Sequence, residues 1–375
     1  TEVIKKQKKE RMKMNNMDRL FLDVHVIQTV PPSNINRDDT GSPKTAQYGG
    51  VRRARVSSQA WKRAMRSYFY DNSEQTNVGV RTLEIIRYVA KQIRQLDSSK
   101  TEEEAMQLAE AVIGAAGVKT ANSRAKALFF LGEQQAQGLA RAALEDTTDK
   151  KAVQQILRAN PAIDIALFGR MVADDPSLNE DASAQVAHAI STHAVQTEFD
   201  FYTAVDDLAP EDNAGAGMLG TIEFNASTLY RYANVAVHEL HRQLENKESV
   251  INTLRLFVES FSNSLPTGKV NTFANQTLPQ AILITLRADR PVNLVSAFEK
   301  PVKSADGYVD ESIRKLEKEF ENVQKFVKAP ELTLMLSAAE ADTEEFNGER
   351  VASLDELLNQ LTVGLERLLS EQPRA

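Results

Sequence analysis

The sequence contains no cysteine, a single tryptophan and only 6% aromatic residues. Without cysteine, a disulfide scaffold, a cysteine zinc site, an iron–sulfur cluster and a cysteine nucleophile are excluded. The chain also has no run of about 18 apolar residues, so we expect no transmembrane helix. The basic N-terminus lacks the apolar stretch of a signal peptide. We therefore expect a cytoplasmic protein that makes no contact with a membrane.

The 375 residues are 42% hydrophobic and 26% charged, which is typical of a soluble chain that can bury a core. This length predicts two or three structural units. The net charge is −7. That value excludes a uniformly basic coat for nucleic acid but allows a local basic patch.

Hydrophobic periodicity predicts alternating blocks of strand and helix. Residues 1–16 are basic and lack an apolar face, so we expect a disordered extension. Alternation from Leu20 predicts a strand that ends at Pro31 and Pro32, because proline cannot donate a ladder hydrogen bond. Ser57 or Ser58 suits the N-cap of a helix. The remaining pattern predicts, in order, a strand at 51–56, a helical block at 68–170, two strand-like arms around a glycine-rich tip at 197–236, a helix at 238–265, a strand at 281–286, a helix at 312–326 and a leucine-rich amphipathic helix near the C-terminus.

Positive charge is concentrated between residues 37 and 66. Eight bases stand there against only Asp38 and Asp39; they are Arg37, Lys44, Arg52, Arg53, Arg55, Lys62, Arg63 and Arg66. On a helix that begins near Ser58, Lys62, Arg63 and Arg66 share one face. In the preceding strand Arg53 and Arg55 share a face by two-residue alternation. A loop, a strand and a helix N-terminus that all supply cations suit a phosphate chain; the alternative is a solvated basic face neutralised by the acidic remainder.

Several other motifs lie in a sequence context that does not support the chemistry they suggest. The G-x-G-x-x-G pattern at 215–220 lies between a loop and a strand-like segment, which is the wrong setting for a dinucleotide site. His238 and His241 are three residues apart rather than four, so they do not form a zinc-protease helix. The pairs Asp38–Asp39 and Asp206–Asp207 are the candidates for a metal site, with turn formation as the alternative. We expect no cofactor.

Several segments resemble the CasC family, the backbone subunits of the type I-E CRISPR Cascade complex. The segments recur in order across about 20–305 and are 26–39 (VIQTVPPSNINRDD), 41–44 (GSPK), 48–64 (YGGVRRARVSSQAWKRA), 164–171 (DIALFGRM), 187–193 (AHAISTH), 201–207 (FYTAVDD), 230–234 (YRYAN) and 293–300 (NLVSAFEK). The resemblance implies an α+β protein shaped like a hand. Its palm has an RNA-recognition-motif-like (ferredoxin-like) fold, its fingers are a helical insertion and its thumb is a β-hairpin. The boundaries implied are 1–16 for the extension, 17–67, 186–192 and 230–375 for the discontinuous palm, 68–185 for the fingers and 193–229 for the thumb.

The resemblance also implies a function. Members of the family bind the CRISPR guide RNA along a filament of identical subunits, beside other Cascade subunits, and present it for pairing with target DNA. The residues that would contact guide phosphates or riboses are Arg37, Lys44, Ser57, Gln59, Lys62, Arg63 and Arg66. Met171 and Leu219 would be apolar wedges near a displaced nucleotide. We expect no enzymatic activity; the alternatives are a metal-dependent ribonuclease that uses Asp38 or Asp39, and an assembly scaffold that touches no nucleic acid.

Overall fold

The computed structural model describes residues 19–72, 77–172, 174–204, 218–338 and 346–370. The predicted extension at 1–16 and the pair Asp206–Asp207 lie outside these ranges. The chain divides into two compact units. The first comprises the described parts of Thr1–Met65, Val186–Asn234 and Arg255–Ala375, and the second comprises those of Arg66–Gln185 and Val235–Leu254.

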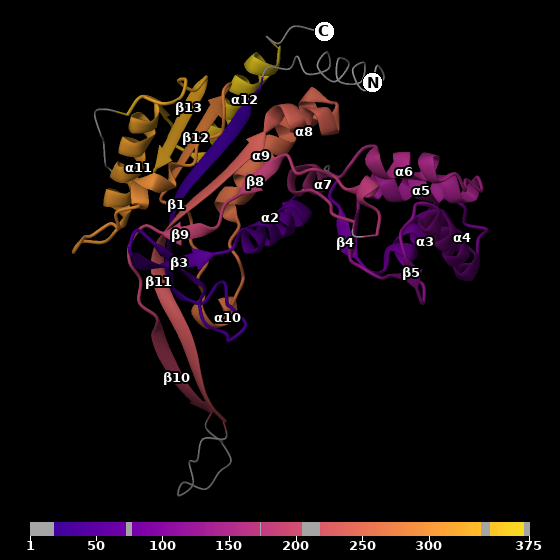
Figure 1. Cartoon of the computed structure of the whole chain (residues 1–375), viewed down its shortest axis with the longest axis horizontal. Helices are drawn as coiled ribbons and strands as arrows, with labels where there is room; N and C mark the ends of the chain where they lie inside the picture. The colour runs from indigo at the N-terminus through magenta and orange to yellow at the C-terminus, as the bar shows by residue number, and fades with distance from the viewer. Residues whose placement is uncertain (1–18, 73–76, 173, 205–217, 339–345, 371–375) are drawn as a thin grey trace, which may run out of the picture. The chain divides into compact units, whose positions relative to one another are not determined.

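A large sheet forms the centre of the first unit (Figure 1). Its strands follow the order β14-β13-β12-β1-β11-β9-β3-β2. Their bounds are β1 Phe21–Ser33, β2 Thr45–Tyr48, β3 Val51–Val56, β9 Ala189–Ser191, β11 Met218–Ala236, β12 Ala281–Arg287, β13 Leu332–Ser337 and β14 Glu349–Arg350. Strand β10 (Glu198–Ala204) pairs antiparallel with the first part of β11. We call β10 together with residues 218–224 the ribbon; Figure 1 shows it extending away from the sheet.

The helices of this unit pack around the sheet, and the longer ones do so through one apolar face. They are α2 Ser58–Asn72, α9 Lys247–Asn263, α10 Val270–Phe273, α11 Val309–Val323 and α12 Leu354–Ser370, with a 3₁₀ turn at Leu294–Phe298; α2 and α9 continue into the second unit. Ile313, Leu316 and Phe320 of α11 pack on Leu283 and Met335 of the sheet. Burying such side chains contributes roughly 1.5–3 kcal/mol each.

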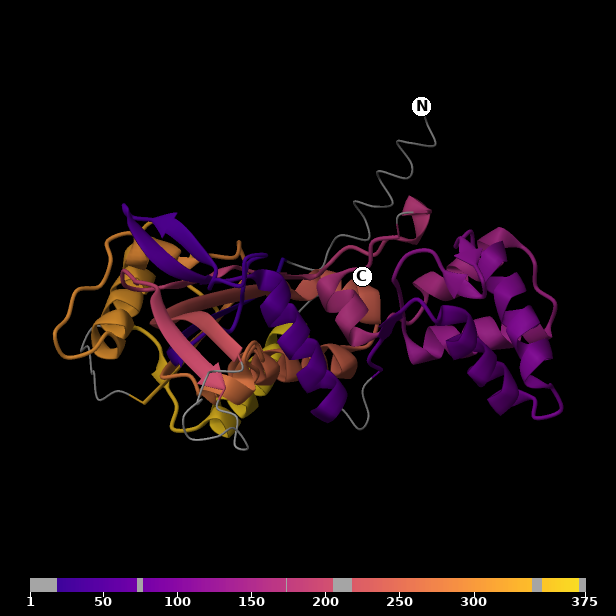
Figure 2. The same cartoon turned by 90° about the horizontal axis from the view of Figure 1, so that it is seen from below.

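The second unit is mainly helical. Its elements are β4 Val80–Thr82, α3 Ile85–Leu96, α4 Glu102–Ala115, β5 Thr120–Ala121, β6 Arg124–Ala125, β7 Phe129–Leu131, α5 Glu133–Leu144, α6 Lys150–Arg158, α7 Ile163–Phe168, a 3₁₀ turn at Pro176–Leu178, β8 Ala184–Val186 at its boundary, and α8 Val237–Leu244. Figure 2 shows α3 to α6, coloured indigo to magenta, packed in one group. Ile86, Val89 and Leu139 lie in its core. Within the described ranges, no helix has the length and apolarity needed to cross a bilayer.

Most predicted elements are confirmed, and the chain is a mixture of helix and sheet as expected. The prediction that Pro31 and Pro32 end the first strand is wrong, since β1 runs to Ser33. Its ladder with β12 stops at Ile27, so neither proline has to donate to that ladder. The single helix predicted at 238–265 is two helices, because Glu245 takes a left-handed conformation with φ 57° and ends α8. The sequence pattern also failed to predict β13 and the two small sheets, β4–β7 and β5–β6.

Candidate nucleic-acid interface

Helix α2 begins at the serine pair, and Ser57 is its cap. The Ser57 hydroxyl accepts a hydrogen bond from the Ala60 N–H at 3.3 Å, as an N-cap residue does. Its own N–H donates to the Asn36 side-chain oxygen at 2.8 Å. Ser57 is 6% exposed. The Ser57 hydroxyl therefore caps α2 in this structure. The contact between Ser57 and RNA that the resemblance implies stays a prediction.

Residues 36–44, which we call the basic loop, form a closed turn between β1 and β2. The Lys44 N–H donates to the Asn36 carbonyl at 2.9 Å, which closes the neck of the loop. The Asp38 carboxylate accepts bonds from the N–H and hydroxyl of Thr40 and from the N–H of Ser42. The Thr40 hydroxyl bond is the largest of the effects that lower the pKa of Asp38. Asp38 thus holds the turn, as expected from aspartate chemistry in loops.

Two asparagines join the basic loop to its neighbours. Asn34, which is 1% exposed, donates to the Gly41 carbonyl at 2.9 Å and to the Glu223 carbonyl of β11 at 2.8 Å. Asn36 accepts the bond from Ser57 at the start of α2. The basic loop, the ribbon and the N-terminus of α2 are therefore tied together by side-chain hydrogen bonds. The sequence placed both asparagines in a motif but gave no sign of these partners, which are distant along the chain.

The predicted cations differ in their exposure. Arg37, Arg63 and the nearby Gln59 are exposed, whereas Lys44 and Lys62 are half-buried. Partial burial lowers the pKa of Lys62. Lys62 and Arg63 follow the capped turn of α2, and Arg37 and Lys44 flank the basic loop. Four of the residues predicted to contact phosphate therefore lie on the basic loop or on α2, the two segments that the Asn36 side chain connects.

The expectation that Arg53 supplies a cation to the basic surface is wrong. Its side chain is fully buried and donates to four backbone carbonyls, those of Tyr48, Ser191, Phe298 and Glu299. Alternation placed Arg53 on one face with Arg55, but the segment that contains Phe298 and Glu299 lies over the Arg53 side chain. Arg53 therefore anchors the β2–β3 hairpin.

Arg55, one of the eight clustered bases, lies beside His188, a residue that the sequence pattern did not assign to the site. An Arg55 guanidinium nitrogen lies 3.2 Å from His188 Nδ1, and its Nε–H donates to the Thr45 carbonyl. Burial is the largest effect that lowers the pKa of His188, followed by the charges of Arg55 and Lys44. His188 is exposed and so belongs to the same basic surface. Only the pairing of β3 with β9 brings these residues together.

Arg66 has a partner within the protein. Its Nε–H lies 3.0 Å from the buried carboxylate of Asp164, and its guanidinium stacks on Phe130 at 4.3 Å from the ring centroid. Asp164 also accepts from the Gly79 N–H at 2.8 Å. Burial raises the pKa of Asp164, and Arg66 opposes this. This structural pairing was not predicted; a contact between Arg66 and RNA stays a prediction.

The two predicted wedges are both exposed apolar residues. Met171 is 83% exposed, and its neighbours anchor it: Arg170 exchanges backbone bonds with Glu180, and the Val172 N–H donates to Asn179. Leu219 is 63% exposed and stands opposite Thr203 in the ribbon. Met171 belongs to the second unit and Leu219 to the first.

The ribbon carries further apolar side chains that were not predicted as site residues. Phe199 and Phe201 are 67% and 65% exposed. Their partners across the ladder are Glu223 and Thr221, and Leu219 follows at the next position of the same face. Phe199, Phe201 and Leu219 therefore form one exposed apolar face. The alternation of Phe199 and Phe201 was the sequence signal that could have found it.

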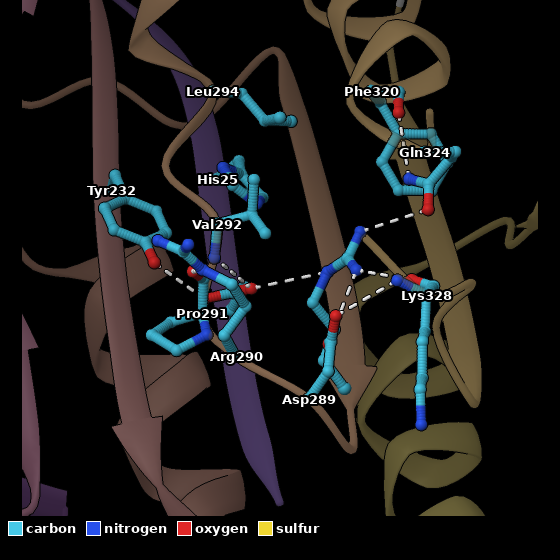
Figure 3. Close-up of polar contacts among 12 residues, drawn as sticks. His25, Tyr232, Asp289, Arg290, Pro291, Val292, Leu294, Phe320, Gln324 and Lys328 are labelled. Atoms are coloured by element: carbon cyan, nitrogen blue, oxygen red, sulfur yellow. Dashed lines mark hydrogen bonds and ion pairs between the residues drawn. The ribbon is translucent and has the colours of Figure 1, made fainter. Parts of the chain in front are cut away.

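A buried polar network fixes the loop that supports Arg53 (Figure 3). The Asp23 carboxylate accepts from the Tyr232 hydroxyl at 2.7 Å and from the Val292 N–H at 3.1 Å. Burial raises the pKa of Asp23 to about 7 and lowers that of the adjacent His25 to about 3. Through Val292 this network holds the loop whose later carbonyls, at Phe298 and Glu299, bind Arg53. It thereby positions the β2–β3 hairpin.

No arrangement for a metal is evident in the described part of the chain, where no group of three His, Asp or Glu side chains is placed to hold an ion. Asp39 is exposed beside the Asp38 turn.

Comparison with known proteins decides the family. The family of CT1975-like proteins matches residues 22–361. The chain belongs to this family. It is also similar to a solved chain described as "CRISPR RNA-guided surveillance complex, pre-nicking", at 32% identity and TM-score 0.82, over 92% of this chain and 100% of that one. A second, "CRISPR RNA-guided surveillance complex", matches at 28% identity and TM-score 0.70 over 92% and 99%.

These matches confirm the family resemblance seen in the sequence. Comparison with curated proteins gives no match.

Proposed function

We propose that this chain is a component of a CRISPR RNA-guided surveillance complex. More specifically, we propose that it is the non-enzymatic backbone subunit of a type I-E complex. Copies of the chain polymerise along the guide RNA beside other Cascade subunits and present the guide for pairing with target DNA. The first unit contributes an RNA-recognition-motif-like palm and the ribbon a thumb. The family and the two similar structures support the proposal.

One observation carries the proposal: Asn36 joins the basic loop to the capped start of α2. The loop carries Arg37 and Lys44, and the helix carries Lys62 and Arg63. Such a surface can hold phosphates without reading bases. The bases of the guide then remain free for Watson–Crick pairing, so that pairing supplies sequence specificity. Met171 and Leu219 are each exposed and apolar, so each is suited to contact a nucleotide that is already unstacked.

The proposal is tested by the salt dependence of RNA binding. The double variant Lys62→Ala/Arg63→Ala is compared with Arg314→Ala/Lys318→Ala, which removes two exposed bases from α11. Binding of two guide RNAs of unrelated sequence is followed by fluorescence anisotropy over a range of salt concentrations. We expect the α2 variant to lose affinity equally for both guides and to lower the salt slope by about 1.4, since each single-strand phosphate contact contributes about 0.7. An unchanged slope, or an equal loss in the α11 control, refutes the assignment.

A further inference from the structure

The side chain of Arg55 is held at the base of the basic loop by groups that do not neutralise its charge. Its Nε–H donates to the Thr45 carbonyl at 3.1 Å, and a terminal nitrogen lies 3.2 Å from His188 Nδ1. Its backbone N–H donates to the Lys44 carbonyl at 2.9 Å. Figure 1 shows β3 beside β9, and His188 immediately precedes β9. We call Arg55 and His188 the Arg–His pair.

The chemistry of the two side chains fixes the protonation of the imidazole. An arginine guanidinium is always charged and carries only N–H donors, so it cannot accept a hydrogen bond. His188 Nδ1 must therefore accept the bond from Arg55, and a ring nitrogen that accepts carries no proton. The ring is then the neutral tautomer with its proton on Nε2. Burial, followed by the charges of Arg55 and Lys44, lowers the pKa of His188, which also favours the neutral ring.

The Nε2–H of His188 is open to a ligand. The residue is exposed, and within the described ranges no group accepts a hydrogen bond from Nε2. Arg55 commits one N–H to Thr45 and one to His188, and its other guanidinium N–H groups make no further bond to a described residue. The Arg–His pair therefore presents a charged donor and a neutral donor on neighbouring side chains.

Strand pairing does not require the Arg–His pair. The backbone ladder already joins β3 to β9, at Arg55 with Ile190 and at Val56 with Ala189. A carboxylate at position 188 would hold the guanidinium more strongly, but it would cancel the positive charge and repel a phosphate. The imidazole instead orients Arg55, leaves its charge intact and adds a donor. A residue choice that serves a ligand better than it serves the fold indicates a binding role.

We propose that the Arg–His pair binds a phosphate of the guide RNA backbone, with His188 acting as a neutral donor through Nε2–H rather than as a cation. The inference rests on the proposed function, because it extends the same basic surface beyond Lys44. A phosphate oxygen can accept from the guanidinium and from the imidazole, and neither contact reads a base. The neutral ring adds a directed hydrogen bond without adding a charge that Arg55 and Lys44 would repel.

Two substitutions at position 188 separate the roles of the two ring nitrogens. In His188→Asn the amide oxygen can still accept from Arg55, but the outward donor is lost; in His188→Gln the amide nitrogen can take the place of Nε2. Guide RNA binding is followed by fluorescence anisotropy across a salt series at pH 8. We expect His188→Asn to lose about threefold to tenfold in affinity with an unchanged salt slope, because a neutral donor releases no counterion, and His188→Gln to stay within about twofold. Arg55→Ala should lower both the affinity and the slope, the latter by about 0.7.

The matched control is His241→Asn, which changes a half-buried histidine of α8 and should bind RNA like the unmodified chain. Three results would overturn the proposal: unchanged affinity in His188→Asn, an equal loss in the control, or a salt slope that falls by about 0.7 in His188→Asn. The last result would mean that His188 binds as a cation.

The tautomer is measured separately from affinity. Long-range ¹H–¹⁵N spectra of the free chain labelled with ¹⁵N-histidine, assigned with His188→Asn, should show the proton of His188 on Nε2 at pH 8. A proton on Nδ1 would contradict the assigned hydrogen bond and with it the proposal. Lys62→Ala/Arg63→Ala is titrated with RNA in parallel. If that variant loses affinity and His188→Asn does not, only the role of the Arg–His pair is wrong; if it binds like the unmodified chain, the proposed function itself fails.

Discussion

Arg63 and Arg66 show how different two arginines on one helix can be. Arg63 is exposed, and its charge is available to a ligand. Arg66 neutralises the buried carboxylate of Asp164 and stacks on Phe130. Removing one member of such a pair leaves a buried charge uncompensated, which is far more costly than losing a surface charge.

We therefore predict effects of very different size for two alanine variants. Arg66→Ala should lower the free energy of unfolding by about 3 kcal/mol, whereas Arg63→Ala should change it by less than about 0.5 kcal/mol. Urea denaturation followed by circular dichroism measures both values. Arg63→Ala should still weaken RNA binding. Equal stability of the two variants would show that the Asp164 pair does not hold the fold.

Two buried residues of β1, Asp23 and His25, predict effects of pH on stability that partly cancel. The pKa of Asp23 is raised in the folded state, so its contribution is complete below about pH 4 and is lost as pH rises towards about 7. The pKa of His25 is lowered, so its contribution is complete above about 6.5 and is lost as pH falls towards about 3. Between about pH 4 and 6.5 the two slopes oppose each other.

Replacing one of the two residues should reveal the pH dependence of stability that the other one causes. In Asp23→Asn the unfolding free energy should gain up to about 1.4 kcal/mol per pH unit as pH rises from 4 to 6.5, relative to the unmodified chain. In His25→Phe it should fall with rising pH over the same interval. Urea titrations at several pH values give the slopes. Two variants with parallel profiles would contradict the assignment of these groups.

At the scale of elements, the interface depends on how the basic loop, the ribbon and α2 are joined. Their hydrogen bonds run through Asn34 and Asn36 and connect segments far apart in sequence. The β2–β3 hairpin is fixed from the other side by buried Arg53. A close approach at Gly49 reinforces this, because a Cβ there would collide with the Glu299 carbonyl oxygen at 1.7 Å. The cations are thus pre-positioned before a ligand binds.

Loosening this junction should weaken binding without removing a phosphate contact. We predict that Asn34→Ala lowers RNA affinity several-fold, because the basic loop must then be ordered on binding, and leaves the salt slope unchanged. Lys62→Ala serves as the comparison, since it should lower both quantities. Anisotropy over a salt series separates the two cases. A slope that falls in Asn34→Ala would mean that the asparagine side chain itself positions a phosphate contact.

At the scale of the whole molecule, a chain of net charge −7 concentrates eight bases between residues 37 and 66. Arg37 on the basic loop and Arg63 on α2 are exposed there. The exposed apolar face of the ribbon offers contacts of a different kind. This division suits a subunit that holds a polyanion and associates with further subunits.

If the chain is a non-enzymatic subunit, it should not cleave the RNA that it binds. Guide RNA bound to the purified chain should stay intact with Mg²⁺, in the unmodified chain and in Asp38→Asn alike, because Asp38 is committed to its turn. Gel electrophoresis of the extracted RNA checks this. Cleavage that disappears in Asp38→Asn or Asp39→Asn would favour the ribonuclease alternative instead.

The sequence by itself determined the local features: the strand from Leu20, the capped start of α2, the two arms of the ribbon and the crowding of bases between 37 and 66. These follow from periodicity, capping and turn chemistry, which act over a few residues. Tertiary structure decided which bases are available. Arg53 is buried and donates to backbone carbonyls, Arg66 pairs with Asp164, and Arg55 lies beside His188. These partners are set by strand pairing and packing between residues up to about 250 positions apart.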